Sequence, residues 1–215
     1  KSGDPQAKLE ARLLEQLKAV LSEGKPARAV VPTAEELPTY RQFNLLTSKP
    51  VLYAANVSET ELDSGNAHTR ALADAIEASG EDAGLILFSA KVEAELAELP
   101  VEDRKDFLDA LGLTESGLDR LARAAYSLLG LRSYFTAGEK EVRAWTIRVG
   151  DKAPQAAAVI HTDFEKGFIR AETVAYDDFV RVSGWKAARE QGLVRSEGKE
   201  YVVQDGDVIL FRFNV

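Results

Sequence analysis

The 215 residues are 45% hydrophobic and 29% charged, as in ordinary globular proteins, and suffice for one large domain or two modest ones. The sequence contains no cysteine and only two histidines, which excludes disulfides and cysteine-based chemistry and argues against a zinc site. Residues 131–215 carry 13 basic and 13 acidic side chains, so the net charge of −8 lies in the remainder and excludes a broad basic surface for nucleic acid.

The first 48 residues predict two helices. Asp4 caps a helix that opens at Pro5, and leucines at helical spacing follow until Gly24. This apolar stripe needs a partner, so we expect it to form one arm of a helical hairpin whose other arm lies upstream. Residues 33–36 (Thr-Ala-Glu-Glu) have the capping-box pattern and predict a second helix that runs to about Leu46.

The middle of the chain predicts a strand–helix–strand unit. Its length of about 40 residues suits a right-handed parallel crossover, in which both strands end at the same edge of a sheet. Two more helices should follow, separated by Gly112. The predicted elements are strands over 50–56 and 84–88, and helices over 65–79, 101–111 and 114–129.

After Gly130 the sequence becomes rich in β-branched and aromatic residues, which predicts a small α+β domain of about 85 residues. Trp145 and Trp185 are expected in its core or at a domain contact. Any RNA contact would be local and confined to this part of the chain. The predicted elements are a hairpin over 132–147, a short helix near 154–161, a strand over 169–174, a helix or loop from Tyr176, and a strand–turn–strand over 201–213.

The N-terminal residues and the hydropathy of the chain bear on its localisation in the cell. No apolar run approaches the roughly 20 residues that span a bilayer, and the first ten residues are polar. We therefore expect a cytoplasmic protein without a membrane segment or signal peptide. The sequence begins at Lys1 and contains no methionine, which is typical of a processed or truncated chain, so we expect a piece of a longer protein.

Polar residues follow the first predicted strand in the pattern Asn-x-x-acid. P-loop NTPases use this pattern to read a base: Asn holds the loop and can meet the purine N7, and the acid accepts ring N–H groups. The GTPase form is Asn-Lys-x-Asp, whereas here Asn56 is followed by Val57 and the acid is Glu59. This change loosens guanine selection and leaves adenine permissible. The alternative is an ordinary capped loop, since Asn and Ser are common after strands.

The second predicted strand is followed by Ser89, Ala90 and Lys91, which match the Ser-Ala-Lys of GTPases. There the backbone N–H groups contact the base and the lysine covers its face. The alternative, a helix cap by Ser89, is compatible with that role. Two such motifs in this order, each after a strand and with a helix between them, favour a base-binding site at the carboxyl ends of parallel strands.

The phosphate-binding half of such a pocket is absent from the sequence. No Gly-x-x-x-x-Gly-Lys-Ser/Thr occurs, because Lys25 is followed by Pro26 and Lys199 by Glu200. Without the loop amides, the lysine and a Mg²⁺-binding hydroxyl, the chain cannot orient a γ-phosphate for transfer. We therefore assign it no catalytic residue and no metal ligand, and its standing as an enzyme stays open.

His161 invites a catalytic role, but a loop histidine that caps a turn or packs on nearby phenylalanines is favoured, since no acid–base pair accompanies it. The cluster around it could instead stack on and pair with RNA. An aromatic core with solvated charges is favoured over that alternative. The cluster comprises Phe164, Lys166, Phe168 and Arg170.

Several stretches, in order, resemble the C-terminal part of the YchF family of Obg-like ATPases, which belongs to the translation-factor-related class of GTPases. The resemblance spans essentially the whole chain, and its last stretch is close to a signature of the family's TGS domain. It is carried by residues 49–59 (KPVLYAANVSE), 89–91 (SAK), 128–131 (LLGL), 135–138 (FTAG), 143–146 (RAWT) and 161–172 (HTDFEKGFIRAE).

The resemblance implies an α/β fold: the C-terminal part of a P-loop NTPase G domain with an inserted helical (coiled-coil) arm, plus an α+β TGS domain of the β-grasp type. Residues 1–48 would form the arm and its connection. Residues 49–130 would complete an OBG-type G domain, and residues 131–215 would form the TGS domain.

The resemblance also implies ligands and partners. The family prefers ATP to GTP, and its hydrolysis and Mg²⁺ binding depend on P-loop and switch segments that would precede Lys1. It binds ribosomes, so the expected partner is ribosomal RNA or protein, reached through the TGS domain and the arm, with no DNA and no membrane. The alternative is a non-catalytic ribosome- or RNA-docking module with a vestigial pocket. The nucleotide would contact Asn56, Val57, Glu59, Ser89, Ala90 and Lys91.

Overall fold

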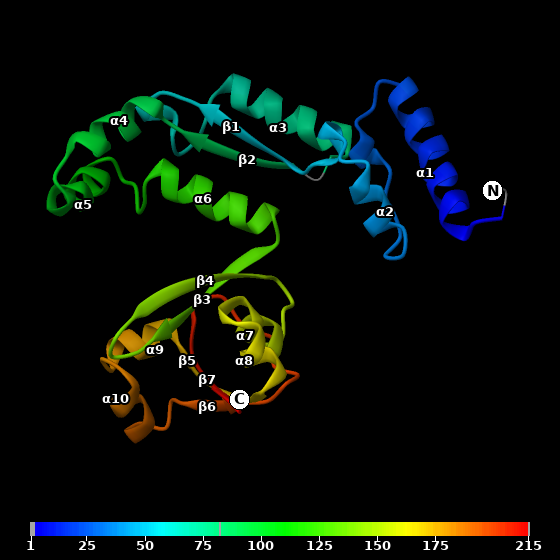
Figure 1. Ribbon diagram of the computed structural model, residues 1–215. Helices are drawn as coiled ribbons and strands as arrows, with labels where there is room; N and C mark the ends of the chain where they lie inside the picture. Colours follow the sequence, from blue (N-terminus) through cyan, green and yellow to red (C-terminus); the bar gives the residue numbers. More distant parts are fainter. Residues whose placement is uncertain (1–2, 82, 215) are drawn as a thin grey trace. The chain divides into compact units, whose positions relative to one another are not determined.

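The computed structural model describes residues 3–81 and 83–214. The chain divides into two compact units, Lys1–Leu128 and Leu129–Val215 (Figure 1). Each unit buries apolar clusters of its own. Within the described ranges, no helix has both the length and the apolar character that crossing a bilayer requires.

The first unit opens with helix α1, Pro5–Ser22. As predicted, Asp4 caps it, and its carboxylate accepts a first-turn N–H at 3.0 Å. One side of the helix is buried, where Leu13 and Leu17 pack in a small cluster with Tyr40. The apolar stripe of α1 is therefore partly covered by the segment that follows it in the chain.

Helix α2 (Leu37–Gln42) is shorter than the sequence predicts. The capping-box bonds form, with the Thr33 N–H donating to Glu36 Oε2 at 2.8 Å and the Glu36 N–H donating to Thr33 Oγ1 at 3.3 Å. These two bonds close a turn over residues 33–36, however, and the helix begins only after it, at Leu37. The helix stops before Leu46 because Asn44 adopts a left-handed backbone conformation with φ 46°. Short 3₁₀ helices precede and follow α2, η1 (Ala27–Ala29) and η2 (Leu46–Ser48).

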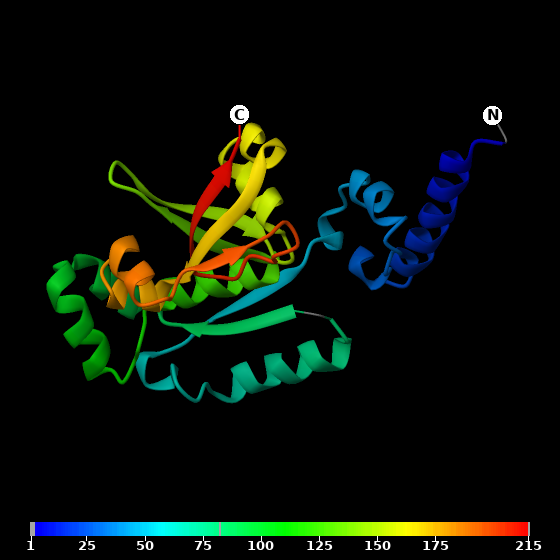
Figure 2. The same cartoon turned by 90° about the horizontal axis from the view of Figure 1, so that it is seen from below.

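A parallel two-stranded sheet follows, as predicted. It pairs β1 (Val51–Asn56) with β2 (Ala83–Phe88), and helix α3 (Ala67–Ser79) makes the crossover between them. Helix α3 and helix α6 (Gly117–Leu128) lie on opposite sides of this sheet (Figure 2). The sheet thus lies between two helical layers.

Two helices separate β2 from α6, namely α4 (Ala90–Glu98) and α5 (Val101–Ala110). Of α4, the sequence predicted only the N-terminal cap, Ser89, whereas α5 corresponds to the helix predicted over 101–111. Helix α6 begins later than predicted, because the hydroxyl of Ser116 accepts the N–H of Asp119 at 3.0 Å and caps the helix there.

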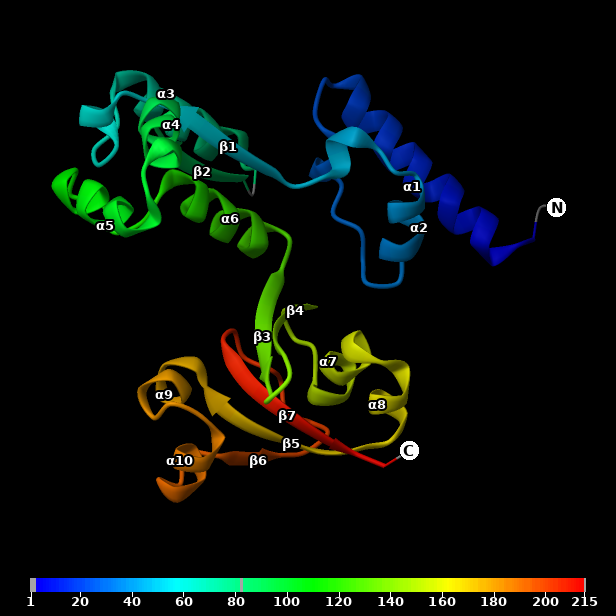
Figure 3. The same ribbon diagram turned by 60° about the vertical axis from the view of Figure 1, so that its left-hand side comes forward.

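The second unit is built on a five-stranded mixed sheet in the order β4-β3-β7-β5-β6 (Figure 3). Strand β7 runs parallel to β3 and antiparallel to β5. The predicted hairpin, short helix and following strand all form, whereas α8, α10 and β6 were not predicted. The elements are β3 (Leu131–Ala137), β4 (Val142–Arg148), α7 (Ala153–Ile160), α8 (Thr162–Lys166), β5 (Phe168–Ala175), α9 (Tyr176–Arg181), α10 (Trp185–Glu190), β6 (Arg195–Glu197) and β7 (Asp207–Phe213).

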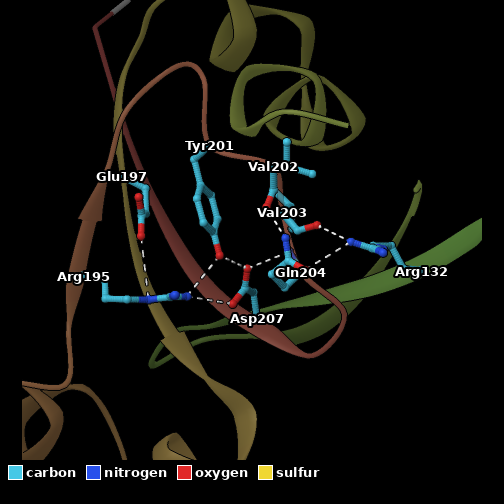
Figure 4. Close-up of polar contacts among 8 residues, drawn as sticks. All are labelled: Arg132, Arg195, Glu197, Tyr201, Val202, Val203, Gln204 and Asp207. Carbon is cyan, nitrogen blue, oxygen red and sulfur yellow. Dashed lines mark hydrogen bonds and ion pairs between the residues drawn. The ribbon is translucent and has the colours of Figure 1, made fainter. Parts of the chain in front are cut away.

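The closing strand–turn–strand predicted over 201–213 is wrong in its first half. Within residues 201–204 no regular strand forms, and Val202 makes only an isolated antiparallel bridge to Lys152. The buried carboxylate of Asp207 ties this segment to the start of β7, because it accepts hydrogen bonds from the Gln204 N–H at 2.9 Å and the Tyr201 hydroxyl at 2.7 Å (Figure 4). Strand β7 pairs with β5 and β3 instead.

Two apolar clusters hold the second unit together. The larger gathers Tyr134, Phe168 and residues of α7, with Trp145 packed against it. The smaller contains Val174 and residues of α10, with Trp185 packed against it. Both tryptophans therefore contribute to the core, as predicted.

His161 has a structural role. Its Nδ1 accepts the N–H of Asp163 at 3.2 Å and caps α8. Phe164 stacks on Phe213 with 3.7 Å between ring centroids, while the side chain of Arg170 stays half exposed. The capping histidine and the aromatic core are thus confirmed, whereas the charge of Arg170 is paired with Glu172.

Candidate functional site

The six candidate residues lie in two loops at one edge of the first unit's sheet. Strands β1 and β2 are parallel and in register, with Asn56 opposite Phe88, so both loops leave the same edge. In open α/β sheets this carboxyl edge is where ligands bind. The first loop contributes Asn56, Val57 and Glu59, and the second contributes Ser89, Ala90 and Lys91.

A single hydrogen bond ties the two loops together. The Oδ1 atom of Asn56 accepts the N–H of Ala90 at 3.0 Å, although 34 positions separate these residues in the chain. Because this bond fixes Oδ1, the two donors of the Asn56 amide nitrogen point elsewhere. Neither donor has a partner among the described residues, so both are available to an acceptor such as the N7 of a purine.

Val57 anchors the first loop. Its side chain is buried with Leu62 and Val92, and its N–H donates to the carbonyl of Phe88 at 2.9 Å. The parallel pairing thus continues one residue beyond β1. A buried valine offers a ligand no polar side-chain group, so Val57 contributes through its backbone and its packing.

Glu59 begins the short 3₁₀ helix η3 (Glu59–Glu61) and is exposed. Over the part of the chain that the structure describes, its carboxylate has no hydrogen-bond or ion-pair partner. Both oxygens are therefore free to accept N–H groups from a base.

Sequence reasoning missed Ser58 and Glu61, which set the shape of this loop. Glu61 Oε2 accepts the hydroxyl of Ser58 at 2.7 Å and the N–H of Ser58 at 3.0 Å. The hydroxyl bond foremost, and then the N–H bond, hold the pKa of Glu61 below its usual range. The signal was present in the sequence, because Ser-x-x-Glu is a capping-box pattern.

The second loop presents one buried and one exposed polar residue. Ser89 is buried and caps α4, where its hydroxyl accepts the N–H of Val92 at 3.5 Å. Lys91 is exposed, and its Nζ lies 3.7 Å from a carboxylate oxygen of Glu95. An exposed pair of this kind is weak, which leaves the ammonium able to turn toward a ligand.

A pocket of about 260 Å³ lies between the loops. It is smaller than the roughly 300–1,000 Å³ of complete small-molecule sites, which suits a base without the rest of a nucleotide. It offers amide donors, a free carboxylate and an exposed ammonium. Among the described residues, no group of three or more acidic or histidine side chains could hold a metal ion. The pocket is lined by Asn56, Val57, Ser58, Glu59, Thr60, Ser89 and Lys91.

Comparisons with known proteins all give relatives with YchF or Obg-like ATPase names. Residues 131–214 match the family model YchF-GTPase_C, described as a protein of unknown function. The whole chain is 55% identical to "Ribosome-binding ATPase YchF" of Bacillus subtilis and covers 59% of it. It is 48% identical to the protein of the same name in Escherichia coli O157:H7 and covers 58% of it. It is 41% identical to "Obg-like ATPase 1" of Rattus norvegicus, and it covers 54% of that protein.

Solved structures agree with these relatives. The structure of the Schizosaccharomyces pombe YchF GTPase matches 95% of the chain with a TM-score of 0.78 and 36% identity, over 55% of its own length. A GTP binding protein from Pyrococcus horikoshii matches 92% of the chain with a TM-score of 0.54 and 19% identity, again over 55% of its own length, and supports the mixed α/β fold alone. The chain thus spans less than two thirds of the relatives it matches.

Proposed function

The chain belongs to the YchF/Obg-like ATPase family, and we propose that it carries the base-recognising half of a nucleotide pocket together with a ribosome-docking domain. The observation that carries the first part is the hydrogen bond between Asn56 and Ala90, because it joins two strand-end loops into one pocket. The second part is supported by relatives that are named ribosome-binding. A protein that works on ribosomes belongs in the cytosol.

The preferred base is adenine. In this proposal the free amide donors of Asn56 meet N7, the carboxylate of Glu59 accepts N6–H₂, and Lys91 covers the ring. Guanine would also offer donors to Glu59, so we expect GTP to bind, but more weakly than ATP. The base-contacting set is that of the two loops, Asn56, Val57, Glu59, Ser89, Ala90 and Lys91.

Hydrolysis needs groups that this sequence does not contain. Cleavage of the β–γ phosphoanhydride depends on loop amides and a lysine around the phosphates and on Mg²⁺. We therefore propose ATPase activity only for a protein in which a segment with these groups is joined to this chain. The residues described here would position the base and, through it, the phosphates.

The domain assignment is part of the proposal. Residues 1–48 would be the returning part of a helical insertion, residues 49–130 the end of an OBG-type G domain, and residues 131–215 a TGS domain. The mixed sheet of the second unit, with β7 between β3 and β5 and helix α7 packed in its core, supports a β-grasp fold.

The test is base selectivity in a longer protein that joins this chain to a phosphate-binding loop. Fluorescent ATP and GTP analogues are titrated into the wild type, Glu59→Asp and, as a matched control, Glu98→Asp, an exposed residue of α4. We expect the wild type to favour ATP, Glu59→Asp to shift the ratio toward GTP, and the control to leave it unchanged. Equal binding of both nucleotides, unaltered by Glu59→Asp, would show that the base-reading assignment is wrong.

A second candidate is a non-catalytic docking module with a vestigial pocket. The lack of any phosphate-binding motif in this sequence favours it, since the second unit could act by itself. It predicts that ribosomes co-sediment with the chain in a salt-sensitive way and that nucleotide makes no difference. Nucleotide-dependent ribosome binding would favour the first proposal instead.

A further inference from the structure

One ion pair connects two parts of the first unit, the N-terminal segment (residues 3–48) and the strand segment (residues 50–128). Arg28 lies in η1, and Glu81 lies between α3 and β2. Nη2 of Arg28 donates to Oε2 of Glu81 at 2.8 Å, although 53 positions separate the two residues in the chain. Across the described residues, no other hydrogen bond or ion pair joins the two segments.

The N-terminal segment is held together by contacts of its own. Its apolar cluster contains Tyr40, whose hydroxyl donates to the carbonyl of Ala27 at 2.8 Å. The N–H of Ala27 donates to Oγ1 of Thr47 at 3.0 Å, and Nη1 of Arg28 donates to the carbonyl of Thr47 at 3.2 Å. The strand segment has a separate cluster around Val57. Each segment therefore forms one body, and Arg28 has a fixed place in the first of them.

The space around the ion pair is open, whereas a fixed interface would be packed. A cavity of about 620 Å³ lies there, and its walls come from the chain after α1, from Ser48 and Pro50, and from the end of α3. Protein interiors normally leave few voids larger than a water molecule. The two bodies thus meet across a hollow, and packing does little to hold one against the other.

The ion pair is strong enough to hold and weak enough to open. The side chain of Arg28 is 21% exposed and that of Glu81 is 18% exposed, so their attraction is less screened than that of an exposed pair. The Nε of Arg28 is buried and has no hydrogen-bond partner among the described residues. Glu81 therefore holds the guanidinium by one bond, in place of the two-point fork that arginine and carboxylate can form.

We propose that the Arg28–Glu81 pair is a latch that fixes the direction of the N-terminal segment, which turns about Lys49 and Pro50 when the pair opens. A covalent connection and an ion pair together hold the segment in one direction. The covalent connection alone leaves a hinge of two residues, since hinge motions need only a few backbone dihedrals to change. The latch is inferred from these contacts and does not depend on the proposed function.

The position of Glu81 gives the latch a consequence. This residue lies two positions before β2, whose other end is followed by Ser89. A partner that turns the N-terminal segment must break the pair, and a charged group of that partner can do so by binding Arg28 or Glu81 in place of its mate. The strand that carries the second loop of the candidate site is then released at its amino end.

The test measures the distance between the two segments in the 215-residue chain. The chain contains no cysteine, so two introduced cysteines take nitroxide spin labels specifically. Gln16→Cys/Ala75→Cys places labels on exposed positions of α1 and α3, and pulsed electron paramagnetic resonance gives the distribution of distances between them. The test variants are Arg28→Gln and Glu81→Gln.

Two controls accompany these variants. Arg12→Gln removes an arginine whose ion pair, with Glu36, lies inside the N-terminal segment. The label pair Gln16→Cys/Gln42→Cys lies on exposed positions within that segment and reports whether it stays folded in the Arg28→Gln background.

We expect a narrow distribution between the segments in the wild type and a distribution about twofold wider, or more, in each test variant. The double variant Arg28→Gln/Glu81→Gln should be no wider than either single one, because all three remove the same contact. Arg12→Gln should match the wild type, and the distances within the segment should not change. Equal widths in the wild type and both test variants, equal widening in Arg12→Gln, or widening within the segment itself would each overturn the proposal.

Discussion

The amide oxygen of Asn56 and the backbone N–H of Ala90 form a 3.0 Å hydrogen bond that joins the ends of two parallel strands. Each loop by itself resembles many capped loops that follow strands. The bond makes them one structure, because any movement of the first loop displaces the start of α4. The candidate pocket therefore depends on an interaction inside the protein as well as on groups that face a ligand.

Two substitutions of Asn56 should separate these roles. Asn56→Ala removes the acceptor and should lower the free energy of unfolding by about 1 kcal/mol. Asn56→Asp keeps an oxygen for the Ala90 N–H and should retain most of that stability, yet it loses the amide donors proposed to meet N7. Urea unfolding measures the first effect, and ATP affinity in the longer protein measures the second. Equal ATP affinity of the wild type and Asn56→Asp would contradict the proposed contact.

The loop that carries Glu59 should loosen in acid. The folded pKa of Glu61 is depressed by its bonds with Ser58, so its contribution to loop order is present above the unfolded pKa of about 4.5 and is lost as the pH falls through the folded value. Amide exchange at Ser58, relative to its intrinsic rate at each pH, should therefore accelerate as the pH falls below about 4.5. Glu61→Gln should show fast exchange at neutral pH, and Glu98→Gln should not.

Glu172 should make the second unit sensitive to acid. Its folded pKa of about 2 lies below the unfolded value, so its stabilising effect is complete above about pH 4.5 and is lost as the pH falls toward 2. Glu172→Gln turns two amide hydrogens toward the three arginines that donate to this carboxylate from β5, β7 and α10, and should cost about 2 kcal/mol at pH 7. Thermal unfolding against pH measures both effects. The exposed Glu139→Gln is the control, and a wild-type pH profile for Glu172→Gln would contradict the prediction.

Tyr201→Phe should destabilise the second unit by about 1–2 kcal/mol, because it removes the hydroxyl that donates to the buried carboxylate of Asp207 at 2.7 Å. Burial first, and then the bond to Asp207, raise the pKa of Tyr201 to about 12. The stabilising effect of the neutral phenol is thus present below about pH 10 and is lost as the pH rises toward 12. Urea unfolding at pH 7 and 11 should show a smaller difference between wild type and variant at pH 11.

Gly167 should tolerate no side chain. A Cβ atom there would lie 1.8 Å from the backbone oxygen of Asn214, whose N–H donates to the Gly167 carbonyl at 2.8 Å. Gly167→Ala must therefore push the end of the chain away and should cost about 2 kcal/mol or more. Gly198→Ala meets no atom within 4 Å and is the control. Equal free energies of unfolding for the two variants in urea would contradict the prediction, because they would show that the chain end near Asn214 moves away without loss of stability.

Much of the fold follows from patterns that act within a few residues. Pro50 and the apolar run after it fix β1, the Asp4 cap fixes the start of α1, and two strand-end motifs fix the candidate pocket. These signals are local, because caps, turns and strand periodicity need no distant partner.

Other features depend on partners that the sequence does not reveal. Residues 201–204 have strand-like composition, yet Val202 forms only an isolated bridge to Lys152, and the Asp207 carboxylate accepts the Tyr201 hydroxyl and the Gln204 N–H. Elements α8, α10 and β6 are too short for a periodic pattern to appear. The bond from Asn56 to Ala90 likewise becomes visible only when strand register places the two loops side by side.

The place of β7 in the sheet has a consequence for synthesis. This strand is the last element of the second unit, yet it lies between β3, which begins 76 positions earlier, and β5. Until residue 213 has left the translating ribosome, the β3–β4 hairpin and the β5–β6 pair have no strand to join them. Such long-range pairing closes slowly. The unit should therefore fold only after its synthesis is complete, and deletion of β7 should leave two separate hairpin-like pieces in place of a shortened domain.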